Sequence, residues 1–383
     1  MTARLRWFAV FSLILVLLPH LFAQSTHHVS ARLPVQGNSR EFAADRPVSP
    51  SSPLTADHAT TTNPWKLLAT IPGAVIHDIS FATPKIGYAA AELGQVWKTT
   101  DGGKTWTEVL NLNFPYYFYG VTTLSANEVV ISGFNDNNFE GILRWSSDGG
   151  TTWTNDIILT TTGWSYRVRF ANPSDGLVVD GLDLDAPNAA HYTTDGGQLV
   201  TDWTQVAPVD PSGGWFGNQF SLLPNLHARM SGITYCSSTN GGQAWSCGPP
   251  IDSVFDGPTF FANDKAGWVG GGEISPNVEG WVHRTTDGGK TWSGRTLDDA
   301  WPIREIRFLT TQFGWAAGGN VYSGVGGMYV SSDGGQTWTL DISTGAEMDA
   351  CDSKHAGKNY QVWCAGYDAS FNGVVYSLRG TLP

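Results

Sequence analysis

The sequence predicts an all-β fold, a seven-bladed β-propeller, on three observations. A turn motif recurs six times at intervals of 45 to 47 residues. Four short strand-like segments accompany each copy, and a further one near Trp65 supplies the strand that the last repeat lacks. A fixed period of this length is typical of repeat architectures, and four strands per period are typical of a propeller blade.

The composition of the motif predicts a hydrogen-bonded turn. Its first copy reads Thr99-Thr-Asp-Gly-Gly-Lys-Thr-Trp106, and in the third copy the tryptophan is displaced to Trp203. A carboxylate can accept N–H bonds across a tight turn, and glycine adopts the positive φ that such a turn needs. We therefore expect a structural, non-catalytic role for the central position. It is occupied by Asp101, Asp148, Asp195, Asn240, Asp287 and Asp333.

The strands around each motif follow one order. An alternating apolar strand comes first, as in Ile76–Phe81, and a second often opens with Gly and an aromatic residue, as in Gly314-Trp315. The third and fourth strands are the arms of the motif hairpin. Residues 346–378 supply three strands, and Pro64–Thr70 resembles the missing fourth. We expect this N-terminal strand to close the last blade and so remove exposed strand edges; six blades are the alternative.

The N-terminus indicates export. Arg4 and Arg6 precede an apolar run, Trp7–Ala23, which predicts a signal peptide over residues 1–23. A membrane anchor is the alternative, but the run is short for a membrane span. Residues 24–62 are rich in Ser, Thr, Pro and His and predict a disordered leader. We expect a secreted or periplasmic propeller over residues 63–383, with no stable membrane span.

Charge and cysteine content restrict the classes of binding partner and cofactor that the chain is expected to have. Residues 1–62 contain five basic and three acidic residues. The rest of the chain contains 17 basic and 31 acidic residues, a net charge of −14. This charge disfavours nucleic acid as a binding partner, because it repels the phosphate backbone. The four cysteines predict two disulfides, Cys236–Cys247 and Cys351–Cys364, because an exported chain favours them. They lack the CxxC spacing of zinc sites, so we expect no metal and no cofactor.

On these motifs the chain resembles the Asp-box (BNR) repeat propellers, most of all the photosystem II assembly-factor propellers. These share the Thr-Thr-Asp-Gly-Gly-Lys-Thr-Trp box and the Gly-Trp second strand seen here at Gly267-Trp268. The resemblance to sialidases and xyloglucan-degrading propellers is more distant, and the shared box implies the fold more than a function. A lipid-anchor cysteine is missing near Ala23. No spacing selects a sialidase-type arginine triad from the nominated residues Arg167, Arg169, Arg304 and Arg307. The xyloglucan enzymes place their catalytic carboxylates between two propellers, and this chain has one.

Propellers of this kind usually bind ligands at the mouth of the central channel, where one blade connects to the next. Those connections are rich in aromatic residues, whose faces fit sugar rings. Alternatively, the rings plug the channel or pack between blades. The ligand-binding candidates are Tyr117, Trp164, Arg167, Trp215, Trp301 and Arg304. His77 is a further residue that could face the channel, although a structural role is the simpler interpretation.

Carboxylates near the same mouth are candidates for acid–base chemistry. Asp256, Asp299 and Glu347 are the catalytic candidates, since a carboxylate pair cleaves glycosidic bonds. For the acidic second-to-third strand loops, such as 135–140, catalysis, calcium binding and plain solvation stay open. Two functions follow. The protein binds an extracellular glycan or hydrolyses it as a glycoside hydrolase; the alternative is a non-enzymatic protein-binding or assembly scaffold. The loop aromatics favour the glycan.

Overall fold

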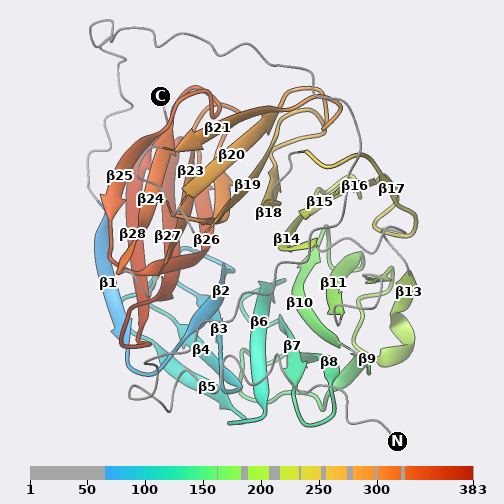
Figure 1. The fold of residues 1–383 in the computed structure, drawn as a ribbon. Helices are drawn as coiled ribbons and strands as arrows, with labels where there is room; N and C mark the ends of the chain where they lie inside the picture. The colour runs from blue at the N-terminus through green and yellow to red at the C-terminus, as the bar shows by residue number, and fades with distance from the viewer. Residues whose placement is uncertain are drawn as a thin grey trace, which may run out of the picture. The chain divides into compact units, whose positions relative to one another are not determined.

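The computed structural model describes residues 65–161, 163–182, 189–206, 216–232, 234–251, 256–273, 279–297, 301–320 and 324–382. These residues form seven four-stranded antiparallel sheets, the blades of a β-propeller (Figure 1). The predicted signal peptide and leader lie outside the described residues. The described part contains no helix long and apolar enough to cross a membrane.

Each blade is a meander whose strands follow one another in the sequence. Blade 1 contains β2 (Ile76–Phe81), β3 (Gly87–Ala91), β4 (Gln95–Thr99) and β5 (Thr107–Asn111). Blade 2 contains β6 (Tyr116–Thr123), β7 (Val129–Asn135), β8 (Glu140–Ser146) and β9 (Ile157–Thr160). Blade 3 contains β10 (Gly163–Phe170), β11 (Gly176–Leu182), β12 (Ala190–Thr193) and β13 (Thr204–Val206), with the short 3-10 helix η1 (Val200–Asp202) before β13. Blade 4 contains β14 (Phe216–Leu222), β15 (Ala228–Gly232), β16 (Tyr235–Ser238) and β17 (Ser246–Cys247).

The remaining blades repeat this order. Blade 5 contains β18 (Asp256–Phe261), β19 (Gly267–Glu273), β20 (Glu279–Thr285) and β21 (Ser293–Leu297). Blade 6 contains β22 (Ile303–Phe308), β23 (Gly314–Asn320), β24 (Val325–Ser331) and β25 (Thr339–Ser343). Blade 7 contains β26 (Glu347–Ala356), β27 (Asn359–Tyr367), β28 (Gly373–Thr381) and β1 (Lys66–Ile71).

The seventh blade closes the ring as the sequence predicts. The N-terminal strand β1 pairs antiparallel with β28, in the order β1-β28-β27-β26. Trp65 anchors it, since its Nε1 donates to Asp341 Oδ2 at 2.7 Å and its ring meets Trp315 edge-on at 6.1 Å. Because Asp341 and Trp315 belong to the part of the chain that builds blade 6, this segment ties the first described residues to the last blades.

Apolar side chains hold the blades to one another. Seven clusters of buried residues each join two neighbouring blades. Between blades 7 and 1, for instance, Trp363 stacks on Phe81 at 3.8 Å and donates its Nε1 hydrogen to Gly102 O at 2.9 Å. A blade cannot bury its two faces alone, so stacking neighbours around the axis supplies the core.

The Asp boxes form the hairpins between third and fourth strands. In the first box, Asp101 Oδ1 accepts from the backbone N–H groups of Lys104 and Thr105, each at 3.0 Å. Gly102 and Gly103 have φ of 82° and 91°, the left-handed region that glycine permits. In the third box an insertion displaces the tryptophan, yet Trp203 Nε1 still donates to Gly197 O at 2.8 Å.

These boxes predict a loss of stability in acid. The hydroxyl of Thr152 and its backbone N–H lower the pKa of Asp148 to about 2, and Thr291 does the same for Asp287. Because the folded-state pKa lies below the ordinary value of 3.8, this stabilisation is present above that value and disappears as the pH falls toward 2. Urea unfolding between about pH 5 and 2 is expected to be less pH-dependent in the double variant Asp148→Asn, Asp287→Asn. An unchanged dependence would contradict this account.

Both predicted disulfides are present. Cys236–Cys247 joins the third and fourth strands of blade 4, and Cys351–Cys364 joins the first and second strands of blade 7. Each staples two directly paired strands, since the register places Cys236 opposite Cys247 and Cys351 opposite Cys364.

Candidate functional site

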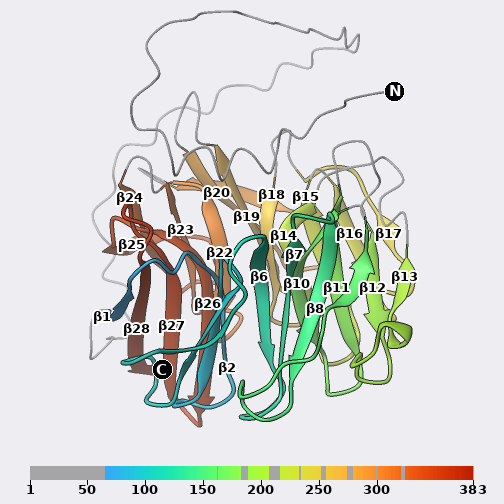
Figure 2. The same cartoon turned by 90° about the horizontal axis from the view of Figure 1, so that it is seen from below.

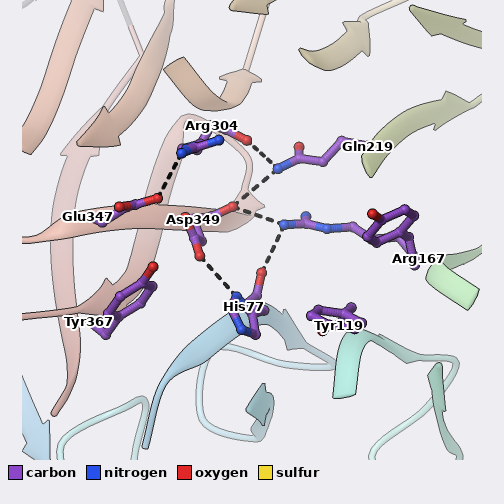
Figure 3. A pocket seen from close by; sticks show the side chains of 9 residues that line it. His77, Tyr119, Arg167, Gln219, Arg304, Glu347, Asp349 and Tyr367 are labelled. Atoms are coloured by element: carbon purple, nitrogen blue, oxygen red, sulfur yellow. Dashed lines mark hydrogen bonds and ion pairs between the residues drawn. The ribbon is translucent and has the colours of Figure 1, made fainter. Parts of the chain in front are cut away.

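A cavity of about 180 Å³ lies at the end of the propeller where the inner strands begin. The Asp boxes lie at the opposite end, beside the first-to-second strand turns, as the bond from Gly102 N to Lys85 O shows. Six blades contribute to the cavity wall. The lining residues are His77, Tyr119, Tyr166, Arg167, Gln219, Arg304, Glu347, Asp349 and Tyr367 (Figure 3).

Irregular strand pairing places most of these side chains. In every blade the pairing between the first and second strands skips one or more residues. A skipped residue bulges from its strand, and a β-bulge redirects side chains. In blade 5 the skipped residues are Gly257 and Pro258, which do not line the cavity. In the other six blades the skipped positions include His77, Tyr119, Tyr166, Arg167, Gln219, Arg304 and Asp349.

His77 lies between two carboxylates in the cavity wall. Its Nδ1 is 3.1 Å from Asp349 Oδ2 and its Nε2 is 3.2 Å from Glu92 Oε1. Burial lowers the pKa of His77, but the hydrogen bonds and charges of Asp349 and Glu92 outweigh burial and raise it to about 10. The imidazole is therefore a cation at neutral pH. The rings of Tyr119 and Tyr367 flank it at 5.2 and 6.1 Å.

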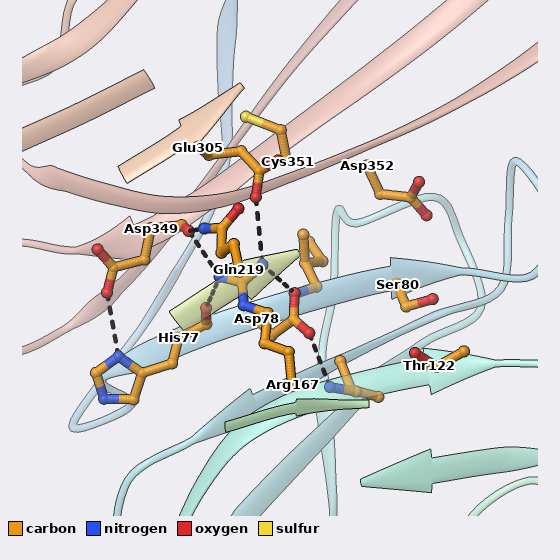
Figure 4. Close-up of polar contacts among 12 residues, drawn as sticks. His77, Asp78, Ser80, Thr122, Arg167, Gln219, Glu305, Asp349, Cys351 and Asp352 are labelled. Carbon is orange, nitrogen blue, oxygen red and sulfur yellow. Dashed lines mark hydrogen bonds and ion pairs between the residues drawn. The ribbon is translucent and has the colours of Figure 1, made fainter. Parts of the chain in front are cut away.

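Arg167 forms the floor of the cavity. Its side chain is buried, with Nη1 3.1 Å from Asp78 Oδ1 and 3.2 Å from Glu305 Oε2 (Figure 4). Its Nη2 donates to the carbonyl oxygens of His77 and Asp349, each at 2.9 Å. These partners come from blades 1, 6 and 7, so one guanidinium on blade 3 links blades across the axis.

Gln219 reinforces this floor from blade 4. Its Nε2 donates to the carbonyl oxygens of Arg304 and Asp349. The floor thus consists of satisfied polar groups.

Arg304 is a cation of the cavity wall with an N–H donor available to a ligand. Its Nη2 is 3.1 Å from Glu347 Oε1, while 41% of its side chain is exposed. Its Nε has no hydrogen-bond partner among the described residues. Beside it, burial and the nearby carboxylates raise the pKa of Tyr367, whose hydroxyl stays uncharged. The open side of the cavity therefore offers an arginine and tyrosine hydroxyls to a ligand.

The structure brings some predicted site residues together. Arg167, Arg304 and Glu347 line the cavity, and Trp164 lies beside it, 6.1 Å from the Tyr166 ring. Tyr117 and Trp301 are buried, at 7% and 5% exposure. The backbone of Asp256 opens β18, but its side chain lies outside the described residues, as do Trp215 and Asp299 entirely.

The other nominated arginines bond to the protein itself. Arg169 donates to Asp78, and Arg307 donates to the Cys351 carbonyl oxygen. No arginine triad assembles among the described residues that line the cavity.

The candidate list did not include five of the lining residues: Tyr119, Tyr166, Gln219, Asp349 and Tyr367. Tyr119 and Tyr166 lie in the aromatic runs 114–119 and 164–167, and their position relative to a bulge was the missing information. Gln219 and Asp349 carry no sequence signal.

Comparison with known proteins gives a fold and no family. No family model and no curated protein matches the chain. The solved structure "YCF48 bound to D1 peptide" superposes with a TM-score of 0.61 at 20% identity, covering 82% of this chain and 97% of that one. YCF48 from Cyanidioschyzon merolae gives 0.60 at 20% identity, covering 82% and 99%.

A glycoside hydrolase is also among the similar structures. The GH74 enzyme of Niastella koreensis gives a TM-score of 0.56 at 16% identity, covering 79% of this chain but 54% of the enzyme. At these identities the likeness concerns the fold alone: the chain is a seven-bladed β-propeller whose structural neighbours include both peptide-bound and carbohydrate-active proteins.

Proposed function

We propose that this protein is a non-catalytic binding propeller that holds a segment of a partner protein at the channel-mouth cavity, outside the cytoplasm. One observation carries the proposal: each carboxylate that lines the cavity already has a cationic partner. Asp349 is bonded to His77, and Glu347 is bonded to Arg304.

Cleavage of a glycosidic bond needs a different arrangement. One carboxyl group must donate a proton to the leaving oxygen while a second, roughly 5–9.5 Å away, acts as nucleophile or base. Here two cations neutralise two carboxylates, and the four side chains form fixed pairs. Such pairs hold rotamers and present hydrogen-bonding groups, which suits recognition better than proton transfer.

The comparisons support a protein ligand. The peptide-bound propeller matches over almost its whole length, whereas the glycoside hydrolase matches over about half of its own. The two disulfides support a location outside the cytoplasm, because such bonds persist in oxidising compartments.

A glycan is the second candidate ligand. Three tyrosines line the cavity, and aromatic rings beside paired polar groups also suit a sugar. A sugar would make use of the hydroxyls of Tyr119 and Tyr367, which line the cavity.

Binding arrays separate these possibilities. The full chain is expressed with export, so that its disulfides can form. It is expected to bind peptides on a random 12-residue array and to release no reducing ends from polysaccharides. Tyr367→Ala is expected to weaken peptide binding at least tenfold. Tyr376→Ala, on β28 of the same blade but outside the cavity, is the matched control and is expected to leave binding unchanged.

Two results would overturn the proposal. Reducing ends released by the wild type and lost in Glu347→Gln would establish a hydrolase. Binding confined to the glycan array would establish a lectin-type protein.

A further inference from the structure

Three adjacent blades present a strained apolar residue at the channel mouth. Leu93, Phe139 and Phe371 lie in the second-to-third strand loops of blades 1, 2 and 7, with φ of 56°, 58° and 58°. Side chains with a Cβ rarely adopt this left-handed region, and glycine or asparagine occupies it at less cost. Leu93 precedes Gly94, also at positive φ, in a two-residue turn that favours Asn-Gly.

Burial does not compensate this strain. Leu93 is 40% exposed and Phe139 is 42% exposed. Phe371 is only partly buried, with its ring stacked near Tyr367 at 6.4 Å. Large apolar residues held in costly conformations and facing solvent are better explained by a ligand than by folding, because strain of this kind clusters at functional sites.

Ring contacts connect two of these loop tips to the cavity. We call the connected residues the aromatic arc; it runs over blades 2, 3 and 7 and passes the imidazole of His77. Along it, ring centroids lie 5.2 to 6.4 Å apart. The arc consists of Phe139, Phe134, Trp164, Tyr166, Tyr119, Tyr367 and Phe371.

The loops that carry these tips are acidic. Glu92, Asp136 and Asp368 lie in the three loops at 92–94, 136–139 and 368–372. These loops contain no Lys or Arg, and neither do the neighbouring connections at 72–75 and 112–115. A partner that lies across this rim meets apolar tips and negative charge, so basic residues complement it.

We propose that the ligand is an extended segment of a partner protein in which apolar side chains alternate with Lys or Arg. The segment lies along the aromatic arc, its apolar side chains contact Leu93, Phe139 and Phe371, and its basic groups face Asp136 and Asp368, since Glu92 is already paired with His77. This inference rests on the proposed function. It adds the chemistry of the partner segment and the surface that recognises that segment.

The test uses synthetic 12-residue peptides and the full chain. One peptide alternates Leu or Phe with Lys; in two controls Glu replaces Lys, or Ser replaces Leu and Phe. The first peptide is expected to bind at least tenfold more tightly than either control, with an affinity that falls as salt rises.

Asparagine substitutions separate binding from folding. Leu93→Asn with Phe139→Asn is expected to weaken binding of the Lys peptide at least tenfold while the thermal unfolding midpoint stays the same or rises, because asparagine tolerates positive φ. Phe371→Asn is expected to weaken binding likewise. Leu226→Asn is the matched control: Leu226 has a φ of 65° but lies at the Asp-box end, where Gly241 N donates to its carbonyl oxygen.

The outcomes are distinguishable. If Tyr367→Ala abolishes peptide binding and the asparagine variants do not, the cavity binds peptides and the arc proposal is wrong. Equal binding of the Glu peptide, or a lower unfolding midpoint in the Leu93, Phe139 variant, also overturns it. If no peptide binds, both proposals fail.

Discussion

Replacing Asp78 with alanine is expected to destabilise the protein by roughly 3–5 kcal/mol, because it leaves buried charge uncompensated. Asp78 is 1% exposed and accepts from both Arg167, at 3.1 Å, and Arg169, at 2.9 Å. It also accepts from the backbone N–H of Val121 at 2.9 Å. The measurement is urea unfolding of wild type and variant at neutral pH.

Repeating the urea unfolding at acidic pH adds a second readout. Burial raises the pKa of Asp78, but the positive charges of Arg167 and Arg169 lower it by more than burial raises it. The net shift of the pKa is therefore downward. The contribution of Asp78 is therefore present above its ordinary pKa of 3.8 and is lost in stronger acid. Glu108→Ala, an exposed carboxylate on β5, is the control and should stay within about 0.5 kcal/mol of wild type. An Asp78→Ala protein as stable as this control would show that the floor of the cavity does not hold the blades together.

Trp65→Ala is expected to cost about 3–5 kcal/mol, the usual range for removing a buried tryptophan. The indole is 7% exposed, packs against Trp315 and donates to Asp341. Its loss also frees Asp341 from one of two donors, since Trp315 Nε1 bonds the same oxygen at 3.1 Å. Unfolding is best followed by circular dichroism, which does not depend on the deleted indole.

Leu67→Ala is the matched control for the closing strand. Leu67 lies two residues away and is 51% exposed, so its truncation should change stability by less than about 0.5 kcal/mol. If Trp65→Ala and Leu67→Ala were equally mild, strand β1 would be an accessory strand and the ring would be closed by blades 6, 7 and 1 alone.

The fold was predictable because it depends on local chemistry repeated at a fixed period. An Asp-Gly-Gly turn can form only a few backbone shapes, and six copies of it set the blade length. The closing strand was predictable for the same reason, since residues 64–70 resemble the strand that follows each box.

The site was predictable only in part, because its geometry depends on where strand alternation fails. Alternation along β2 tells which residues face a neighbouring blade, but the skipped residue His77 follows no period. Arg167 shows the difficulty most clearly. As an arginine beside loop aromatics it has the features of a ligand-binding residue, yet its partners Asp78 and Glu305 lie 89 and 138 positions away in the sequence. Only the closed ring brings them within reach.

The skipped residue at the start of each inner strand has an evolutionary consequence. Its side chain takes part neither in the regular ladder nor in the apolar clusters between blades, so it can change without disturbing the core wherever it makes no polar contact with another blade. Blade 2 carries Tyr119 there, blade 4 carries Gln219 and blade 5 carries Gly257 with Pro258. A descendant could thus acquire a new specificity by point substitutions at the positions without such contacts, one blade at a time, whereas the skipped residue Arg167 must stay because it pairs with the buried Asp78 and Glu305.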